Sequence, residues 1–221
     1  MTKDEFAKYI DHTNLSPKAT HSDIKTLCED ALRYNFAAVC VNPCRVGFAA
    51  SFLEGSSVKV ASVVGFPLGA TFTEAKALET KYALRSGASE IDMVINIGAL
   101  KDGDDNFVIK DISAVVKAAD GATVKVILEC CYLTDEEKAR GCRLSVKGGA
   151  NFVKTSTGFG SSGATIEDVK ILRENVPANI GVKAAGGIRD FKTAYAFIKV
   201  GATRIGTSSG PQIMSSFDPL V

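Results

Sequence analysis

Eight short apolar segments alternate with stretches of helical periodicity along the whole chain, and this alternation restricts the fold more than any other feature. Continuous apolar runs of this length are typical of strands that are buried on both faces of a parallel sheet. Each parallel connection needs a crossover, which the intervening helices supply. The alternation therefore predicts an α/β fold, a (β/α)8 TIM barrel, as a single domain over residues 1–221.

The predicted elements follow each other in strict order. The predicted strands span residues 10–14, 37–42, 59–65, 90–96, 124–129, 151–155, 181–185 and 203–207. The predicted helices span residues 20–34, 44–53, 73–86, 104–119, 135–147, 166–174, 190–200 and 209–216, with a short extra helix at residues 3–9. Gly87, Gly149 and Gly201 each precede an alanine and a predicted strand, so we expect them to end helices in a left-handed conformation.

Charge and composition exclude several classes of partner. The 26 basic and 25 acidic residues leave a net charge of +1, which gives no reason to expect nucleic acid or a membrane surface. No apolar run is long enough to span a membrane, and the charged first residues do not resemble a signal peptide. We therefore expect a cytoplasmic protein whose partner is a small molecule.

The cysteines and histidines predict no metal site. The six cysteines show no second pair to match the spacing of Cys40 and Cys44, so we expect reduced thiols. His12 and His21 are the only histidines, too few for a zinc site built from several histidines.

Two lysines stand at the ends of predicted apolar strands, and each is followed by small residues and glycine. These are Lys154 and Lys183. Lysine is rarely buried fully without a partner. A desolvated amine near another cation gives up its proton more easily and becomes a nucleophile for carbonyl carbons. The pair therefore predicts amine chemistry on a carbonyl substrate.

Side chains two residues apart share one face of a strand. Asp92 and Asn96 share one face of the fourth predicted strand, and Lys125 and Glu129 share one face of the fifth. The opposite faces are apolar and are needed under the helices, so the polar faces must point into the barrel.

The inward residues Asp92, Lys125, Lys154 and Lys183 are therefore expected to converge on the barrel axis. Clustered ionisable groups are more often functional than structural. The alternative is a buried layer of ion pairs that only fills the barrel, and it applies most directly to Lys125 and Glu129.

Glycine-rich segments follow the seventh and eighth predicted strands, at residues 186–189 and 206–210. Glycines let backbone N–H groups approach an anion, and a helix that starts there adds its positive end. Barrel enzymes frequently bind phosphate with these two loops. The segments predict a phosphate site, and the alternative is that the glycines only form tight turns.

Two further strand-end residues leave alternatives open. His12 can contact substrate or make a structural hydrogen bond. Cys40 can line the pocket or pack as a small apolar group.

Five segments together carry a resemblance to a known family. They read DHTNL at residues 11–15, VVGFPLG at 63–69, EIDMV at 90–94, FVKTSTG at 152–158 and GVKAAGGIR at 181–189. They resemble the deoxyribose-phosphate aldolase family, and the similarity runs from about residue 5 to about residue 216. The segments around Lys154 and Lys183 are the most specific.

The resemblance implies a class I aldolase that needs no metal or other cofactor and cleaves 2-deoxy-D-ribose 5-phosphate reversibly to glyceraldehyde 3-phosphate and acetaldehyde. It implies that Lys154 forms the Schiff base and that Lys183 is the second lysine, which eases deprotonation of the first. It further implies that Asp92 belongs to the proton relay and that Lys125 is an additional pocket lysine.

We also expect Thr13, Cys40 and Thr157 to bind substrate beside Lys125. The resemblance places the phosphate on Gly158, Gly186, Gly187, Arg189, Gly206, Ser208 and Ser209. In two respects the sequence departs from some family members. Phe159 stands where they carry a phosphate-binding lysine, and no tyrosine follows Tyr195, so a C-terminal tyrosine shuttle is absent or replaced by water.

Two other functional hypotheses remain compatible with the sequence. The chain can be a different lysine-dependent aldolase or synthase on the same barrel, or a sugar-phosphate-binding barrel without catalysis, because fold alone does not separate these. The sequence gives a sugar phosphate as the expected partner and leaves open a homodimer or a higher homo-oligomer.

Overall fold

Eight parallel strands form a closed barrel in their order along the chain. They are β1 (Ile10–Asn14), β2 (Ala38–Val41), β3 (Lys59–Val64), β4 (Glu90–Val94), β5 (Thr123–Ile127), β6 (Phe152–Lys154), β7 (Gly181–Ala185) and β8 (Arg204–Thr207). The computed structural model describes residues 1–218, and in it β8 pairs with β1 to close the ring. The predicted (β/α)8 fold is confirmed, and the last three residues of the predicted domain lie outside the described part.

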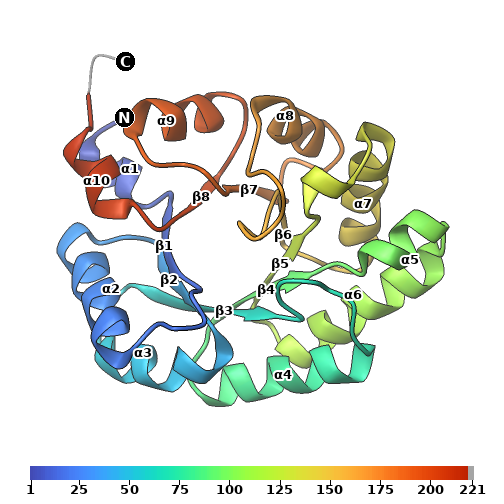
Figure 1. Cartoon of the computed structure of the whole chain (residues 1–221), viewed down its shortest axis with the longest axis horizontal. Coiled ribbons are helices and arrows are strands. Elements are labelled where there is room, and N and C mark those ends of the chain that lie inside the picture. The colour runs from blue at the N-terminus through green and yellow to red at the C-terminus, as the bar shows by residue number, and fades with distance from the viewer. Residues whose placement is uncertain (219–221) are drawn as a thin grey trace.

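The helices surround the strands as an outer layer (Figure 1). They are α1 (Lys3–Ala7), α2 (His21–Tyr34), α3 (Val46–Phe52), α4 (Thr73–Arg85), α5 (Ile97–Asp102), α6 (Asp105–Ala119), α7 (Asp135–Lys147), α8 (Ile166–Glu174), α9 (Phe191–Lys199) and α10 (Gly210–Ser215). Two 3-10 turns, η1 (Pro43–Arg45) and η2 (Cys130–Tyr132), follow β2 and β5. None of the helices within residues 1–218 is long and apolar enough to cross a membrane.

Two predicted strands end two residues earlier than the sequence suggested. β4 stops at Val94 because Asn96 caps the unpredicted helix α5, and its Oδ1 accepts the N–H of Ala99 at 3.1 Å. β5 stops at Ile127, and Glu129 adopts a left-handed backbone with φ of 58°. The prediction that Asn96 and Glu129 continue the inward strand faces is therefore wrong. Polar residues at a strand end cap a helix or form a turn as readily as they extend a strand.

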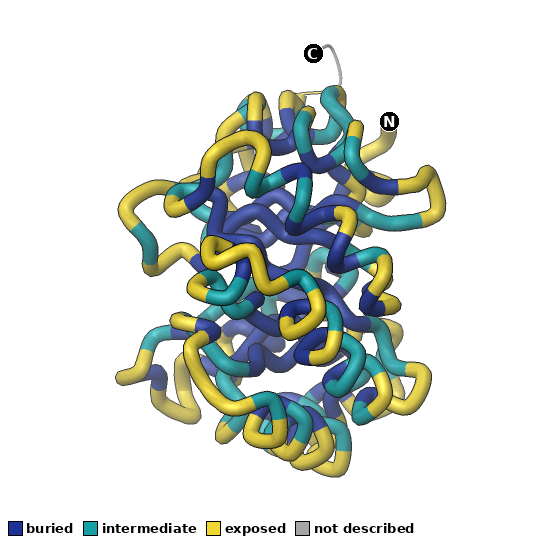
Figure 2. The backbone as a smooth tube through the Cα atoms, turned by 90° about the vertical axis from the view of Figure 1, so that its right-hand side faces the viewer, coloured by how far each residue is buried: buried dark blue, intermediate teal, exposed yellow. Residues whose placement is uncertain are grey.

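The main hydrophobic core lies between the strands and the helices, where the tube is buried along the centre and exposed at the rim (Figure 2). Ile91 and Met93 of β4 point into this layer, which leaves Asp92 on the inward face. A smaller apolar cluster of Leu15, Cys40, Ala61 and Val63 lies apart from the main core.

Glycine ends three helices as predicted. Gly87, Gly149 and Gly201 have φ of 104°, 90° and 110°, which side chains other than glycine's rarely adopt. Each turn returns the chain to the next strand and so sets where that strand enters the barrel.

Candidate active site

Three strand lysines converge on one carboxylate inside the barrel. Lys125 Nζ donates to Asp92 Oδ1 at 2.7 Å, and Lys154 Nζ and Lys183 Nζ each donate to Asp92 Oδ2 at 2.8 Å. Asp92 is in register with Lys125 across β4 and β5, and Lys154 with Lys183 across β6 and β7. The predicted convergence of these four residues is what the geometry shows.

A second layer of charges lies against the first, and sequence reasoning did not assign it. Asp11 accepts from Lys183 at 2.5 Å and from Arg204 at 2.6 Å. Glu90 lies 2.6 Å from Lys125 Nζ and 3.3 Å from Arg204 Nη1. Glu90 stands two residues before Asp92 on the same strand, so the period-two rule could have found it. No pattern in the sequence indicated that the Arg204 side chain joins this network.

The whole network holds four cations and three carboxylates. The cations are Lys125, Lys154, Lys183 and Arg204, and the carboxylates are Asp11, Glu90 and Asp92. One positive charge is therefore in excess in a buried interior, where an unbalanced charge is costly.

Burial and neighbouring charges act in opposite directions on these groups. Burial would raise the pKa of Asp92, but the charges of Lys125, Lys154 and Lys183 outweigh it and hold that pKa well below its usual value. Burial would lower the pKa of Lys183, but Asp11 and Asp92 outweigh it and raise that pKa. Burial would also lower the pKa of Lys125, but the charge of Asp92 opposes it, and that pKa is raised. At neutral pH Asp92 is therefore an anion, and Lys125 and Lys183 are cations.

A cavity of about 930 Å³ borders this network, and the three lysines differ in their access to it. Lys154 lines the cavity, whereas Lys125 and Lys183 do not and have fully buried side chains. Lys154 is thus the one of the three lysines that an incoming molecule can reach.

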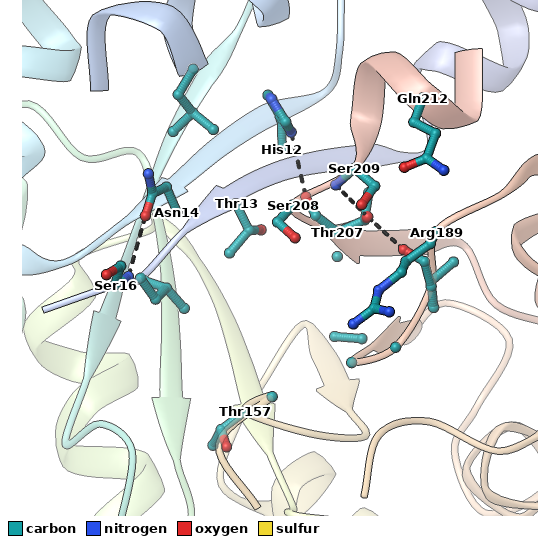
Figure 3. Close-up of a pocket in the computed structure, with 18 of the residues that line it drawn as sticks. His12, Thr13, Asn14, Ser16, Thr157, Arg189, Thr207, Ser208, Ser209 and Gln212 are labelled. Carbon is teal, nitrogen blue, oxygen red and sulfur yellow. Dashed lines mark hydrogen bonds between the residues drawn. The ribbon is translucent and has the colours of Figure 1, made fainter. Parts of the chain in front are cut away.

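All seven predicted phosphate-binding residues line the same cavity. They are Gly158, Gly186, Gly187, Arg189, Gly206, Ser208 and Ser209. The Arg189 side chain, labelled in Figure 3, makes no ion pair or hydrogen bond within residues 1–218. The backbone N–H groups of Gly187, Arg189 and Ser208 also make no hydrogen bond to the described residues. Unpaired donors and a free guanidinium suit a phosphate group.

The remaining predicted substrate-binding residues lie in different surroundings. Thr13 and Thr157 line the cavity. The Thr13 hydroxyl donates to the backbone oxygen of Asp11 at 2.9 Å. Cys40 is fully buried in the small apolar cluster and does not line the cavity, and burial raises the pKa of its thiol.

Thr157 is held by a buried carboxylate that the sequence left unassigned to the pocket. Its hydroxyl donates to Glu129, and its N–H lies 3.2 Å from Glu129 Oε1. The Thr157 hydroxyl oxygen also accepts the N–H of Phe159 at 3.0 Å. Glu129 therefore fixes the loop that follows Lys154, and the residue type alone did not reveal this role.

No set of three or more histidine, cysteine, aspartate or glutamate side chains within residues 1–218 is arranged to hold a metal ion. The metal-independent mechanism stays a prediction.

Comparison with known proteins now decides the family. Residues 6–216 match the family described as DeoC/LacD family aldolase. The chain belongs to the DeoC/LacD aldolase family. A deoxyribose-phosphate aldolase of Aciduliprofundum boonei is 60% identical over 220 residues, which cover 99% of either chain. One from Thermococcus gammatolerans is 60% identical over 95% of either chain.

Solved structures of DeoC/LacD aldolase relatives share the barrel. A putative deoxyribose-phosphate aldolase of Coccidioides immitis has a TM-score of 0.94 at 43% identity, over 97% of this chain and 86% of its own. The deoxyribose-phosphate aldolase of Aeropyrum pernix, described as a unique tetramer, has a TM-score of 0.92 at 36% identity, over 100% of this chain and 94% of its own.

Proposed function

We propose that this DeoC/LacD aldolase is a class I deoxyribose-phosphate aldolase, which reversibly cleaves 2-deoxy-D-ribose 5-phosphate to glyceraldehyde 3-phosphate and acetaldehyde. One observation carries the proposal. Lys154 shares Asp92 with two other lysines, yet it is the one of the three that lines the cavity. The two relatives described above at 60% identity bear the name of this activity.

The charge count supports Lys154 as the nucleophile. Loss of its proton leaves three cations and three carboxylates in the network. Lys183 contacts Asp11 and Asp92, and Lys125 also contacts Glu90, whereas Lys154 contacts Asp92 alone. Lys154 therefore has the fewest carboxylate partners of the three amines and lines the cavity, which supports it as the nucleophile.

The reaction follows from a neutral Lys154 amine. The amine adds to the aldehyde carbon of the open-chain sugar, and the carbinolamine loses water to form a protonated imine. The proton of the C3 hydroxyl leaves, the C2–C3 bond breaks, and its electron pair moves toward the imine nitrogen to give an enamine. Glyceraldehyde 3-phosphate departs. Protonation of the enamine carbon and hydrolysis then release acetaldehyde and restore Lys154.

Asp92, Lys183 and water transfer protons during these reaction steps. Lys183 stays charged through its contacts with Asp11 and Asp92, so it disfavours a second positive charge beside it. Asp92 accepts hydrogen bonds from both amines at 2.8 Å and can pass protons between them and the reacting groups. The phosphate residues anchor the far end of the sugar, which orients the carbonyl carbon toward Lys154.

The proposal extends to the oligomeric state and the cellular location of the enzyme. The tetrameric relative supports a homo-oligomer, which light scattering of the purified protein would test. All six cysteines are unpaired thiols, which supports a cytoplasmic location.

An activity assay tests the function and separates the rivals. The protein should release acetaldehyde and glyceraldehyde 3-phosphate in equal amounts from 2-deoxy-D-ribose 5-phosphate, and prolonged EDTA treatment should leave the rate unchanged. Acetaldehyde should act as donor in the reverse direction. Failure to use acetaldehyde would favour a different lysine aldolase, and a rate lost to EDTA and restored by zinc would contradict the class I mechanism.

A further inference from the structure

His12 is a buried imidazole beside the cavity that the proposed reaction does not use. It is 4% exposed, and its ring packs edge-on against Phe36 at 5.5 Å between centroids. Its neighbour Asp11 joins the interior charge network, so His12 points to the other side of β1, toward α2 and α10. The sequence left substrate contact and structural hydrogen bonding open for this residue.

Both ring nitrogens of His12 face oxygen atoms. Nδ1 lies 3.4 Å from the backbone oxygen of Thr207, and Nε2 lies 3.5 Å from Asp30 Oδ2 (the first contact is dashed in Figure 3). Asp30 belongs to α2 and lines the same cavity. The imidazole therefore lies between a carboxylate of α2 and the end of β8, and as a neutral ring it can donate to only one of these two oxygens.

The oxygen that His12 contacts belongs to the peptide between Thr207 and Ser208. The N–H of that same peptide is the Ser208 N–H, which makes no hydrogen bond to the described residues. In a trans peptide the C=O and the N–H point in opposite directions. A donor at His12 Nδ1 thus holds one side of the peptide while its other side presents the Ser208 N–H.

Thr207 fixes the same turn through its own side chain. Its hydroxyl donates to the Ile188 oxygen at 2.7 Å and accepts the Ser209 N–H at 2.9 Å. The Ser209 N–H is consequently occupied, and within this turn the Ser208 N–H remains available for a ligand. Any control of the direction of that one N–H acts directly on anion binding.

We propose that His12, with its proton on Nδ1, is a positioning residue for the substrate phosphate and that it acts by orienting the Thr207–Ser208 peptide. The inference rests on the proposed function for the identity of the substrate, but it also applies to an unattached phosphate ion. The bond from Nδ1 polarises the peptide and strengthens the Ser208 N–H as a donor, because hydrogen bonds in a chain reinforce one another.

Three substitutions of His12 separate positioning from packing. The amide nitrogen of Asn reaches the position of Nδ1, that of Gln reaches the position of Nε2, and Leu keeps bulk without a donor. His12→Leu and His12→Gln should each weaken inorganic phosphate binding, measured by calorimetry, about tenfold, which corresponds to about 1.4 kcal/mol. His12→Asn should restore most of the affinity.

Kinetics with two substrates complete the test. The same variants should raise KM for 2-deoxy-D-ribose 5-phosphate more than they change kcat, and should leave kcat/KM for unphosphorylated 2-deoxyribose unchanged. Asp30→Asn, at a partly exposed side chain, offers Nε2 an amide donor in place of a carboxylate and favours the tautomer with the proton on Nδ1, so phosphate affinity should stay at the wild-type level or rise.

Two outcomes would overturn the inference. One is an equal loss with both sugars in folded variants, which would make His12 a structural residue. The other is phosphate binding that is the same in wild type and in folded His12→Leu or His12→Gln. A wild-type protein that binds inorganic phosphate with the predicted order of variants but does not cleave the sugar phosphate would refute the proposed function alone.

Discussion

The protein buries lysines in two regions, and only one of these regions has the properties of an active site. Between α4 and α6, Lys76 Nζ lies 2.6 Å from Asp111 Oδ2 and donates to the Val94 oxygen at 2.9 Å, and both side chains are buried. One cation meets one carboxylate there, and Lys76 does not line the cavity. Inside the barrel, four cations meet three carboxylates, and Lys154 reaches the cavity.

The difference teaches that burial alone does not make a lysine functional. A balanced, closed pair such as Lys76 and Asp111 fixes two helices and the end of β4. An excess of one cation, with the least-paired amine open to a cavity, instead favours a neutral amine that can react. The same lysine-to-methionine substitution should therefore abolish activity in the barrel and lower stability between the helices.

The largest expected effect is on turnover when Lys154 is replaced. Lys154→Met removes the nucleophile, so kcat/KM for 2-deoxy-D-ribose 5-phosphate should fall by a factor on the order of 10⁴ or more. The free energy of unfolding, measured with urea, should change little, because the remaining three cations and three carboxylates still balance one another. A stable variant with substantial activity would place the nucleophile elsewhere.

The matched substitution in the other region should affect stability. Lys76→Met leaves the Asp111 carboxylate buried without its cation, which should lower the free energy of unfolding by roughly 3–5 kcal/mol. Activity per folded molecule should be unchanged. Adding Asp111→Leu should recover part of the loss. If Lys76→Met were stable but inactive, the distinction between the two regions would be wrong.

A third substitution tests the anchoring end of the cavity. Ser208→Asp places a negative charge in the part of the cavity that is proposed to bind the phosphate. It should lower kcat/KM for the phosphorylated sugar roughly a hundredfold, because the juxtaposed like charges of Asp and phosphate cost several kcal/mol. The effect on unphosphorylated 2-deoxyribose should be small, and Ser208→Asn is the control of similar size. Equal losses with both sugars would argue that this loop is only a turn.

The smallest effect is a dependence of stability on acid pH. The network holds the pKa values of Asp11 and Asp92 below those of the unfolded chain. Their stabilising contribution is therefore complete above an unfolded pKa of about 3.9 and is lost as the pH falls toward the folded values. Urea unfolding at a series of pH values should show this loss below about pH 4. A stability that stays flat through that range would mean that these carboxylates are not held by cations.

The sequence predicted the barrel, its strand order and the inward charges because these follow from local patterns. Alternating apolar segments gave the strands, and the period of two gave Asp92 and Lys125 a common interior. The same rule failed at Asn96 and Glu129, where helix capping and a left-handed turn end the strands.

Local sequence patterns could not predict the contacts between elements that are distant in the chain. Arg204 pairs with Asp11 of the neighbouring strand β1 and with Glu90 across the barrel, and Lys76 pairs with Asp111 between helices. Each depends on which side chains meet after the ring closes. The exposure of Lys154 relative to Lys125 and Lys183 also follows from strand register and loop position, which no single segment encodes.

The most direct test of the central claim is to trap the imine. The protein is incubated with 2-deoxy-D-ribose 5-phosphate, reduced with borohydride and digested, and the modified lysine is mapped by mass spectrometry, with Lys154→Met as control. The account predicts one adduct, on Lys154, and none in the control. An adduct on Lys183, Lys125 or Lys76, or no adduct in a protein that binds the sugar phosphate, would contradict it.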